Sequence, residues 1–172
     1  MNQIVTHKTK ILFRSILIMA LALITLTACS TKEKKESDSA DKTAQYQNAS
    51  GDLVIPVSEI SDKASFYPVT ADGTKMEVLA VKAPDGTIRT AFNTCQICFG
   101  SGKGYYKQEG DKLVCQNCGN QFSMDLVEVE AGGCNPWPIF DENKTVTDES
   151  ITIPSGFLKE SEQIFANWKK SY

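Results

Sequence analysis

Four cysteines in the second half of the sequence have the spacing Cys-x2-Cys-x16-Cys-x2-Cys, at Cys95, Cys98, Cys115 and Cys118. Two close pairs joined by a short loop can bring four thiolate sulfurs onto one metal ion or one iron–sulfur cluster. The only histidine, His7, lies in an N-terminal segment that we expect to be removed. The remainder therefore excludes mixed Cys/His zinc fingers, His-ligated clusters and catalysis by a histidine base. We predict that the chemistry of this chain depends on sulfur.

The spacing of the two pairs favours a metal site, but it does not select the metal. Zinc, mononuclear iron and an iron–sulfur cluster all accept four thiolates. Two alternatives stay open: the cysteines could form disulfides outside the cytoplasm, or one pair could act in thiol–disulfide exchange. Exchange is disfavoured because the Phe-Gly-Ser-Gly loop after Cys98 does not provide the helix N-terminus that lowers a thiol pKa.

A fifth cysteine, Cys134, lies in the string Gly-Gly-Cys-Asn-Pro at residues 132–136. An odd thiol outside the cell is open to oxidation unless it is buried, bound or used. Cys134 is therefore a further candidate ligand or a redox-active thiol, with a buried bystander as the alternative.

The first 28 residues have the features of a lipoprotein export signal. A basic stretch that ends at Arg14 precedes an apolar run at 16–24, which is shorter than the roughly 20 residues of a membrane-spanning helix. The residues Leu-Thr-Ala before Cys29 resemble the lipobox of bacterial lipoproteins, in which this cysteine is lipidated and becomes the N-terminus. We expect lipid anchoring on the extracytoplasmic face of the cell membrane. An uncleaved anchor with a coincidental cysteine is the alternative.

Composition divides the rest of the chain into a tether and one domain. Residues 29–50 are rich in Lys, Glu, Asp and Ser, with almost nothing apolar besides Tyr46, and predict a disordered tether. Residues 51–172 are long enough for one domain with its own hydrophobic core. The leader carries three basic residues and no acidic one, so the mature chain is more negative than the −3 of the whole sequence. This charge argues against nucleic acid as a partner and favours a basic redox partner.

The domain is predicted to be mainly β, as a small sandwich or barrel-like fold with two cysteine-bearing loops and a C-terminal helix. Apolar or alternating segments indicate strands at 53–57, 66–69, 76–81, 87–92, 105–106, 112–114 and 151–153, and an extended segment at 135–140. Turn signals lie at Asp72-Gly73 and Gly110-Asp111. Ser155 is a candidate N-cap for a helix that reaches about Lys169, whose aromatic stripe should contact the sheet.

Four strings surround the cysteines: Ala-Phe-Asn-Thr-Cys-Gln-Ile-Cys at 91–98, Gly-Lys-Gly-Tyr-Tyr at 102–106, Gly-Asp-Lys-Leu-Val-Cys-Gln-Asn-Cys-Gly-Asn-Gln-Phe at 110–122 and Gly-Gly-Cys-Asn-Pro at 132–136. Together they resemble the FtrD-like membrane iron–sulfur family, over about Ile55 to Pro138. The resemblance implies an extracytoplasmic iron–sulfur or iron-handling protein, linked in some members to electron supply for iron uptake. It implies Cys95, Cys98, Cys115 and Cys118 as cluster ligands. Family members often carry this domain on a multi-span membrane protein, whereas a lipid anchor is predicted here.

A fainter similarity concerns the second cysteine pair. The string Cys115-x2-Cys118-Gly-x2-Phe122 is similar to the second box of Rieske proteins, with cysteine where histidine would stand. Ligation by cysteine alone would place the reduction potential below that of a Rieske centre, so the cluster would tend to donate electrons.

These observations predict a membrane-tethered iron–sulfur or iron protein that acts in electron transfer or iron handling with a membrane redox or iron-transport partner. The sequence has no hydrolase elbow, P-loop or dinucleotide motif, so an electron carrier or metal-binding module is favoured over an enzyme. Two other hypotheses are kept. One is a structural four-cysteine zinc module that binds a protein partner. The other is a thiol–disulfide protein with reversible Cys95–Cys98 or Cys115–Cys118 bridges.

Overall fold

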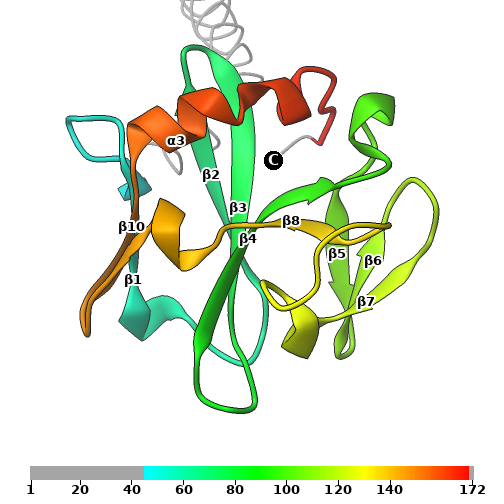
Figure 1. Cartoon of the computed structure of the whole chain (residues 1–172), viewed down its shortest axis with the longest axis horizontal. Helices are drawn as coiled ribbons and strands as arrows, with labels where there is room; N and C mark the ends of the chain where they lie inside the picture. Colours follow the sequence, from blue (N-terminus) through cyan, green and yellow to red (C-terminus); the bar gives the residue numbers. More distant parts are fainter. Residues whose placement is uncertain (1–44, 171–172) are drawn as a thin grey trace, which may run out of the picture. The chain divides into compact units, whose positions relative to one another are not determined.

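The strands form three antiparallel sheets, seen at the left, centre and right of Figure 1 in a computed structural model that describes residues 45–170. The first sheet has the order β1 (Leu53–Pro56), β10 (Ser150–Ile153), β9 (Thr145–Val146). The central sheet has the order β2 (Ser65–Ala71), β3 (Thr74–Lys82), β4 (Ile88–Cys95), β8 (Pro136–Pro138). The third has the order β5 (Tyr106–Glu109), β6 (Lys112–Cys115), β7 (Gln121–Ser123).

Short helical segments lie between these strands, and the last two of them follow the final strand, β10. They are η1 (Val57–Glu59), η2 (Phe99–Ser101), η3 (Met124–Leu126), η4 (Asp141–Asn143), α3 (Ser155–Glu160) and η5 (Glu162–Phe165). The predicted mainly β class is confirmed, and the strands of the described part of the chain do not close into a barrel.

The predicted hairpins are present. Asp72 and Gly73 connect β2 to β3 with φ angles of 41° and 89°, the positive values that a tight two-residue hairpin turn requires. Gly110 and Asp111 connect β5 to β6. Strand β4 runs to Cys95, three residues beyond its predicted end, and so delivers the first cysteine pair directly from the central sheet.

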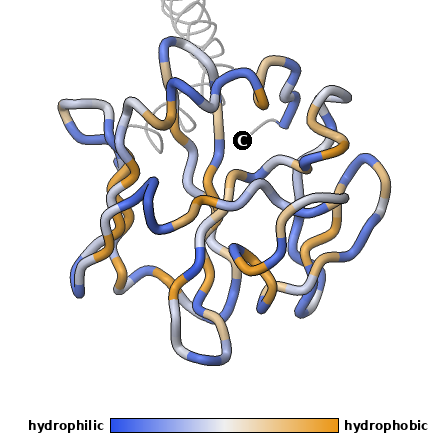
Figure 2. Tube along the Cα trace, in the orientation of Figure 1, coloured by the Kyte–Doolittle hydropathy of each residue, from blue (hydrophilic) through white to orange (hydrophobic). Residues whose placement is uncertain are grey.

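The two faces of the central sheet contribute to two different cores, and Figure 2 shows apolar residues along its strands. Alternate residues of a strand point to opposite faces, which explains how one strand serves both cores. The larger core takes Met76, Val78, Ala80 and Phe92 from β3 and β4 and packs them against β1, β10, α3 and η5. The smaller core takes Leu79, Val81, Ala91 and Cys95 and packs them against the third sheet. Cys95, Cys98 and Cys115 belong to this smaller core, and Cys134 packs against it.

The C-terminal helix is shorter than predicted. Pro154 occupies the N-cap position, and the backbone N–H of Ser155 donates to Asp52 Oδ1 at 2.8 Å instead of Ser155 acting as the cap. Helix α3 ends at Glu160, where the Ser161 hydroxyl donates to the Phe157 carbonyl at 2.9 Å and the chain continues as η5. Such side-chain bonds to the preceding turn compete with regular helix. The prediction of a helix to Lys169 is therefore wrong, whereas the predicted contact of the aromatic stripe with the sheet is confirmed.

Contacts with the domain begin before residue 51. The ring of Tyr46 meets that of Tyr67 edge-on at 4.9 Å between centroids. The Gln47 side chain accepts a hydrogen bond from Thr70 N–H at 2.9 Å and donates to the Thr70 carbonyl at 3.0 Å. The predicted export signal at 1–28 and Cys29 lie outside the described residues. Within residues 45–170, no helix has the length and apolar character needed to cross a bilayer.

The aromatic packing of η5 gives a stability prediction. Phe165 is 2% exposed and contacts the rings of Phe92 and Trp168. The variant Phe165→Ala should lower the free energy of unfolding by about 3–5 kcal/mol, because it removes buried apolar surface and leaves a cavity. Urea unfolding measures this, with Val146→Ala at a 51% exposed position as the control. Equal unfolding midpoints for the two variants would contradict the proposed packing.

Candidate metal centre

Three segments bring the cysteines together beside the central sheet. Cys95 ends β4 and is followed by the loop to η2, while Cys115 ends β6 and is followed by the turn to β7. The start of β8 pairs with the end of β4, with Pro136 opposite Cys95, and this places Cys134 beside the first pair. Because strand pairing fixes all three backbones, the cysteine loops meet at one edge of the smaller core.

The five sulfurs form one cluster made of two overlapping groups. The Sγ atoms of Cys95, Cys98 and Cys115 all lie within 4.8 Å of one another, and so do those of Cys98, Cys118 and Cys134. The Cys118 and Cys134 sulfurs are 3.8 Å apart. Cys98 belongs to both groups. The structure thus brings together the four predicted ligands and also Cys134.

Burial divides the cluster into two parts. Cys95, Cys98 and Cys115 are 0%, 8% and 1% exposed, and we call them the inner thiols. Cys118 is exposed and Cys134 is half-buried, and we call these two the outer thiols. All five are free cysteines. The centre is therefore shielded on one side and open to solvent on the other.

The backbone around each pair is suited to contact with sulfur. The Cys98 N–H donates to Cys95 Sγ at 3.4 Å. Gly119, directly after the second pair, has a φ of +73°, which favours glycine, and its N–H donates to the Cys115 carbonyl at 2.9 Å. Gly104 must also be glycine, since a Cβ there would lie 2.7 Å from the Cys98 carbonyl group. A backbone N–H that donates to sulfur, as that of Cys98 does, reduces the free-energy cost of bringing thiolates together and tunes the reduction potential of a bound metal.

The thiols differ in acidity when no metal is bound. Burial raises the pKa of Cys115 to about 12, and the neighbouring Cys118 thiol raises the pKa of Cys134 to about 12. The Asn120 N–H lowers the pKa of the exposed Cys118. At Cys95 burial acts to raise the pKa, but the Tyr106 hydroxyl and the amides of Cys98 and Ile97 outweigh it and lower the pKa overall. A state with every thiol ionised therefore needs a positive counter-charge.

The segments that carry the cysteines do not supply that charge. Residues 93–102, 113–124 and 131–140, which carry all five cysteines, contain no Asp, Glu, Lys or Arg. Thiolate is therefore the only anionic ligand in these segments, and it is a soft one. This donor set fits zinc, iron or an iron–sulfur cluster and does not fit the oxygen-seeking calcium and magnesium ions.

Sequence reasoning missed the residues that hold the Cys134 segment in place. The Gln96 side chain accepts a hydrogen bond from Gly132 N–H at 2.9 Å and donates to the Pro136 carbonyl at 3.0 Å. The Cys134 carbonyl accepts hydrogen bonds from the Tyr106 hydroxyl at 2.8 Å and from Asn120 Nδ2 at 3.0 Å. These partners come from both cysteine loops and from β5, so only the folded chain reveals them.

A polar network continues from Tyr106 into the sheet. Asn93, on β4, accepts from Tyr106 N–H at 2.7 Å and donates to Glu77 Oε2 at 2.5 Å. Glu77 is 2% exposed and forms an ion pair with Lys170, while Trp168 Nε1 donates to the Asn93 carbonyl at 3.2 Å. The C-terminal segment thus reaches the residues next to Cys95. Asn93, a polar residue between Phe92 and the first cysteine pair, was the sequence signal that could have indicated this network.

A buried ion pair anchors the long segment on both sides of Cys134. Lys144 Nζ lies 2.5 Å from Glu128 Oε1 and donates to the Ile139 carbonyl at 3.0 Å and to Thr90 Oγ1 at 3.1 Å. The other Glu128 oxygen accepts from Thr90 N–H at 2.8 Å. The charges are therefore paired and hydrogen-bonded to β4, which is the condition for a buried pair to be tolerated.

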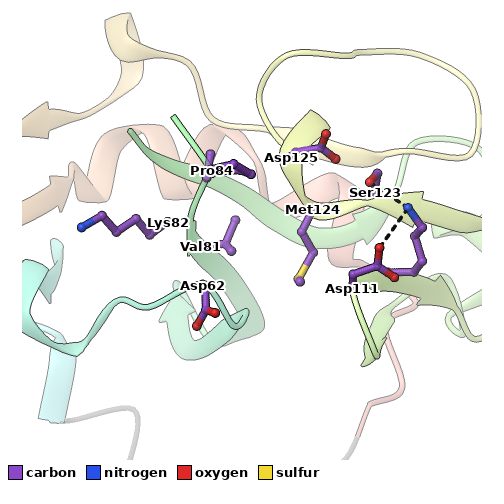
Figure 3. A pocket seen from close by; sticks show the side chains of 10 residues that line it. Asp62, Val81, Lys82, Pro84, Asp111, Ser123, Met124 and Asp125 are labelled. Carbon is purple, nitrogen blue, oxygen red and sulfur yellow. Dashed lines mark hydrogen bonds and ion pairs between the residues drawn. The ribbon is translucent and has the colours of Figure 1, made fainter. Parts of the chain in front are cut away.

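The structure has a cavity of about 650 Å³, which Figure 3 shows from close by. Lys112, at the opposite end of β6 from Cys115, contributes to its lining and contacts Asp111 and Ser123. Asp62, Asp125 and the apolar side chains of Val81 and Met124 complete much of the wall. None of the cysteines lines this cavity.

Comparison with known proteins identifies the family. The model of the family described as membrane iron–sulfur containing protein FtrD-like matches residues 60–165. Comparison with curated proteins and with solved structures gives no match. The matched range includes all five cysteines of the cluster.

The hydrogen bond from Tyr106 predicts how the Cys134 segment is held. Tyr106→Phe should fold, lose about 1 kcal/mol of stability and make Cys134 react faster with a maleimide, because one of the bonds to the Cys134 carbonyl is gone. Mass spectrometry of the labelled peptides gives the rate. Tyr105→Phe is the matched control and should leave the rate unchanged. If both variants label at the same rate as the unchanged protein, the Tyr106 hydroxyl does not position Cys134.

The Glu128–Lys144 pair gives a second prediction. The Lys144 side chain is 1% exposed and that of Glu128 is 13% exposed, so Lys144→Met leaves a buried carboxylate without its cation. We expect a loss of about 3–5 kcal/mol in urea unfolding. The double variant Lys144→Met/Glu128→Gln should recover part of this loss, since it removes the unpaired charge. A double variant no more stable than the single one would argue against the ion pair as the cause.

Proposed function

Because this chain belongs to the FtrD-like family of membrane iron–sulfur proteins, we propose that its cysteine cluster holds iron, as an iron–sulfur cluster or an iron–thiolate centre. We propose that this centre serves in one-electron transfer or iron handling linked to iron uptake. The observation that carries the proposal is the gathering of five free thiols at one edge of the core, on the segments 93–102, 113–124 and 131–140, which contain no charged residue. A soft, thiophilic metal is what such a donor set binds best.

The arrangement of the inner and outer thiols supports electron transfer. Bound iron would supply the change of one electron, and the chain would supply the environment. The inner thiols would hold the metal in an apolar core, while Cys118 would bring the centre to the surface where a partner can approach. Thiolate ligands without basic neighbours disfavour added negative charge, so the potential should be low and the centre should act as a donor.

A redox partner would meet an exposed apolar side chain next to the thiols. Ile97 lies between Cys95 and Cys98 and is 64% exposed, so it offers an apolar contact next to the metal ligands. The net negative charge of the domain would steer a basic partner from a distance, and the surface around Ile97 would form the close contact. We propose a membrane-bound redox or iron-transport protein as the partner, with lipid at Cys29 holding this chain on the extracytoplasmic face.

Thiol–disulfide exchange is the second candidate, and one specific observation favours it. The outer thiols Cys118 and Cys134 are 3.8 Å apart, and the pKa of the exposed Cys118 is lowered by the Asn120 N–H. These two cysteines are therefore placed to form a disulfide with each other. A structural zinc module is the third candidate, since four thiolates also suit zinc.

Metal analysis of the full chain tests the proposal. The protein should be purified without oxygen and examined for iron, acid-labile sulfide and zinc, together with its visible absorption spectrum. We expect a coloured protein that contains iron, because the thiols provide its ligands. A colourless protein with zinc would favour the structural module, and a metal-free protein with a reversible Cys118–Cys134 bridge would favour thiol exchange.

Serine substitutions then identify the ligands. Cys95→Ser, Cys98→Ser, Cys115→Ser and Cys118→Ser should each remove most of the bound iron, and Cys134→Ser should have a smaller effect. Cys29→Ser is the control, because it removes the predicted lipid attachment site and no cysteine of the cluster, and it should leave the iron in place. Full iron retention in two of the first four variants would rule out the four predicted ligands as a set.

A further inference from the structure

We propose that the five thiols form two adjoining metal positions and that the Cys98 thiolate bridges them. The inner position is lined by Cys95, Cys98 and Cys115, and the outer position by Cys98, Cys118 and Cys134. The site is thus a two-metal thiolate centre, and Cys134 is one of its ligands. This inference rests on the proposed function in one respect, namely that the cluster binds metal.

The distances between sulfurs carry the first step. Four thiolates at about 2.3 Å from one tetrahedral ion lie about 3.8 Å from one another. Among residues 45–170, the groups of ligand atoms within 4.8 Å of one another are the two sets of three, and no set of four is that compact. Two three-thiol positions are therefore already formed, whereas one four-thiol position would need a rearrangement of the loops.

Cys98 occupies the place that a bridging ligand needs. It is the one thiol that belongs to both groups, and at 8% exposed it is the least buried of the inner thiols. A thiolate sulfur has lone pairs enough for two metal ions. Five thiols with one shared give each ion three protein ligands, so no cysteine of the cluster is left over.

The Cys134 segment is fixed as a ligand-bearing loop would be. Four hydrogen bonds hold the backbone on both sides of Cys134, from Gln96 in the first cysteine loop, Asn120 in the second and Tyr106 in β5. A bystander thiol would not require this immobilisation. Ordering before metal arrives lowers the cost of binding, because the chain loses less freedom when the ion is bound.

Charge favours the second ion. Five ionised thiols carry five negative charges, and the segments that bear them contain no basic residue. One divalent ion would leave an excess of three charges beside a buried core, which is costly in a medium of low polarity. Two divalent ions leave an excess of one.

The metal ions at the two positions should exchange at different rates. The inner ion would be enclosed by thiols that are at most 8% exposed, while the outer ion would sit beside the exposed Cys118. Three protein ligands leave a fourth coordination place, and at the outer position this place faces solvent. The outer ion is therefore the exchangeable one, which suits a thiophilic divalent cation that is taken up and passed on.

Cadmium titration of the full chain tests this inference. The reduced, metal-free protein with the background change Cys29→Ser is titrated with Cd²⁺, and binding is followed by thiolate-to-metal absorption and by ¹¹³Cd NMR. We expect two equivalents per chain and two ¹¹³Cd signals that are coupled through the shared sulfur. A chelator should remove one ion at least tenfold faster than the other.

Variants assign the two positions. Cys134→Ser and Cys118→Ser should each retain one tightly bound ion and lose the coupling, and Cys95→Ser should likewise reduce the count to one. Ser123→Ala, at a serine that lies outside the cluster, is the control and should still bind two. Circular dichroism and the unfolding midpoint confirm folding. If Cys134→Ser does not fold, Cys118→Ser tests the same outer position.

Three results would overturn the inference. They are one equivalent of Cd²⁺ in the unchanged cluster, two equivalents in Cys134→Ser, or two ¹¹³Cd signals without coupling. The proposed function fails on different evidence, since it requires iron in the protein isolated from cells. A protein that binds two Cd²⁺ but contains no iron would retain the two-metal centre and reject the iron protein.

Discussion

The gathering of five thiols on segments without charged side chains is the constraint on which the rest of the structure depends. Sulfurs this close cannot all ionise unless a cation neutralises them, and residues 93–102, 113–124 and 131–140 include no lysine or arginine. Amides can soften this cost, as the Cys98 N–H does for Cys95, but they cannot remove it. The fold therefore makes sense as a scaffold for a metal that is bound by sulfur alone.

The fold supports the metal centre with a central sheet that contributes to two hydrophobic cores. One face of β3 and β4 packs against the helical C-terminus and the first sheet, and the other packs against the third sheet and the cysteines. The metal centre is thus attached to strands that a separate hydrophobic core already stabilises. Long-range polar contacts complete the arrangement, with the Glu128–Lys144 pair and the Gln96 side chain fixing the segment of Cys134.

Local patterns predicted the elements whose signals are local. The Asp72-Gly73 and Gly110-Asp111 turns, the strand that leads into Cys95 and the apolar C-terminal stripe are all present. The length of the last helix was mispredicted, because the spacing of its apolar residues does not show that the Ser161 hydroxyl donates to the Phe157 carbonyl. Strand β7 was missed because it has three residues and one apolar side chain, Phe122.

The sequence by itself determined the chemistry: beyond Cys29 it contains two close cysteine pairs and one further cysteine, and it has no histidine beyond His7, so sulfur is the available soft ligand. Only the tertiary structure decided that Cys134 joins the pairs, that Cys98 lies in both groups of three, and that Tyr106, Asn120 and Gln96 hold the last segment. The physical reason is that spacing within a loop determines which cysteines of that loop can bind the same ion. Whether separate loops meet depends instead on strand pairing and on buried polar contacts between residues far apart in the chain.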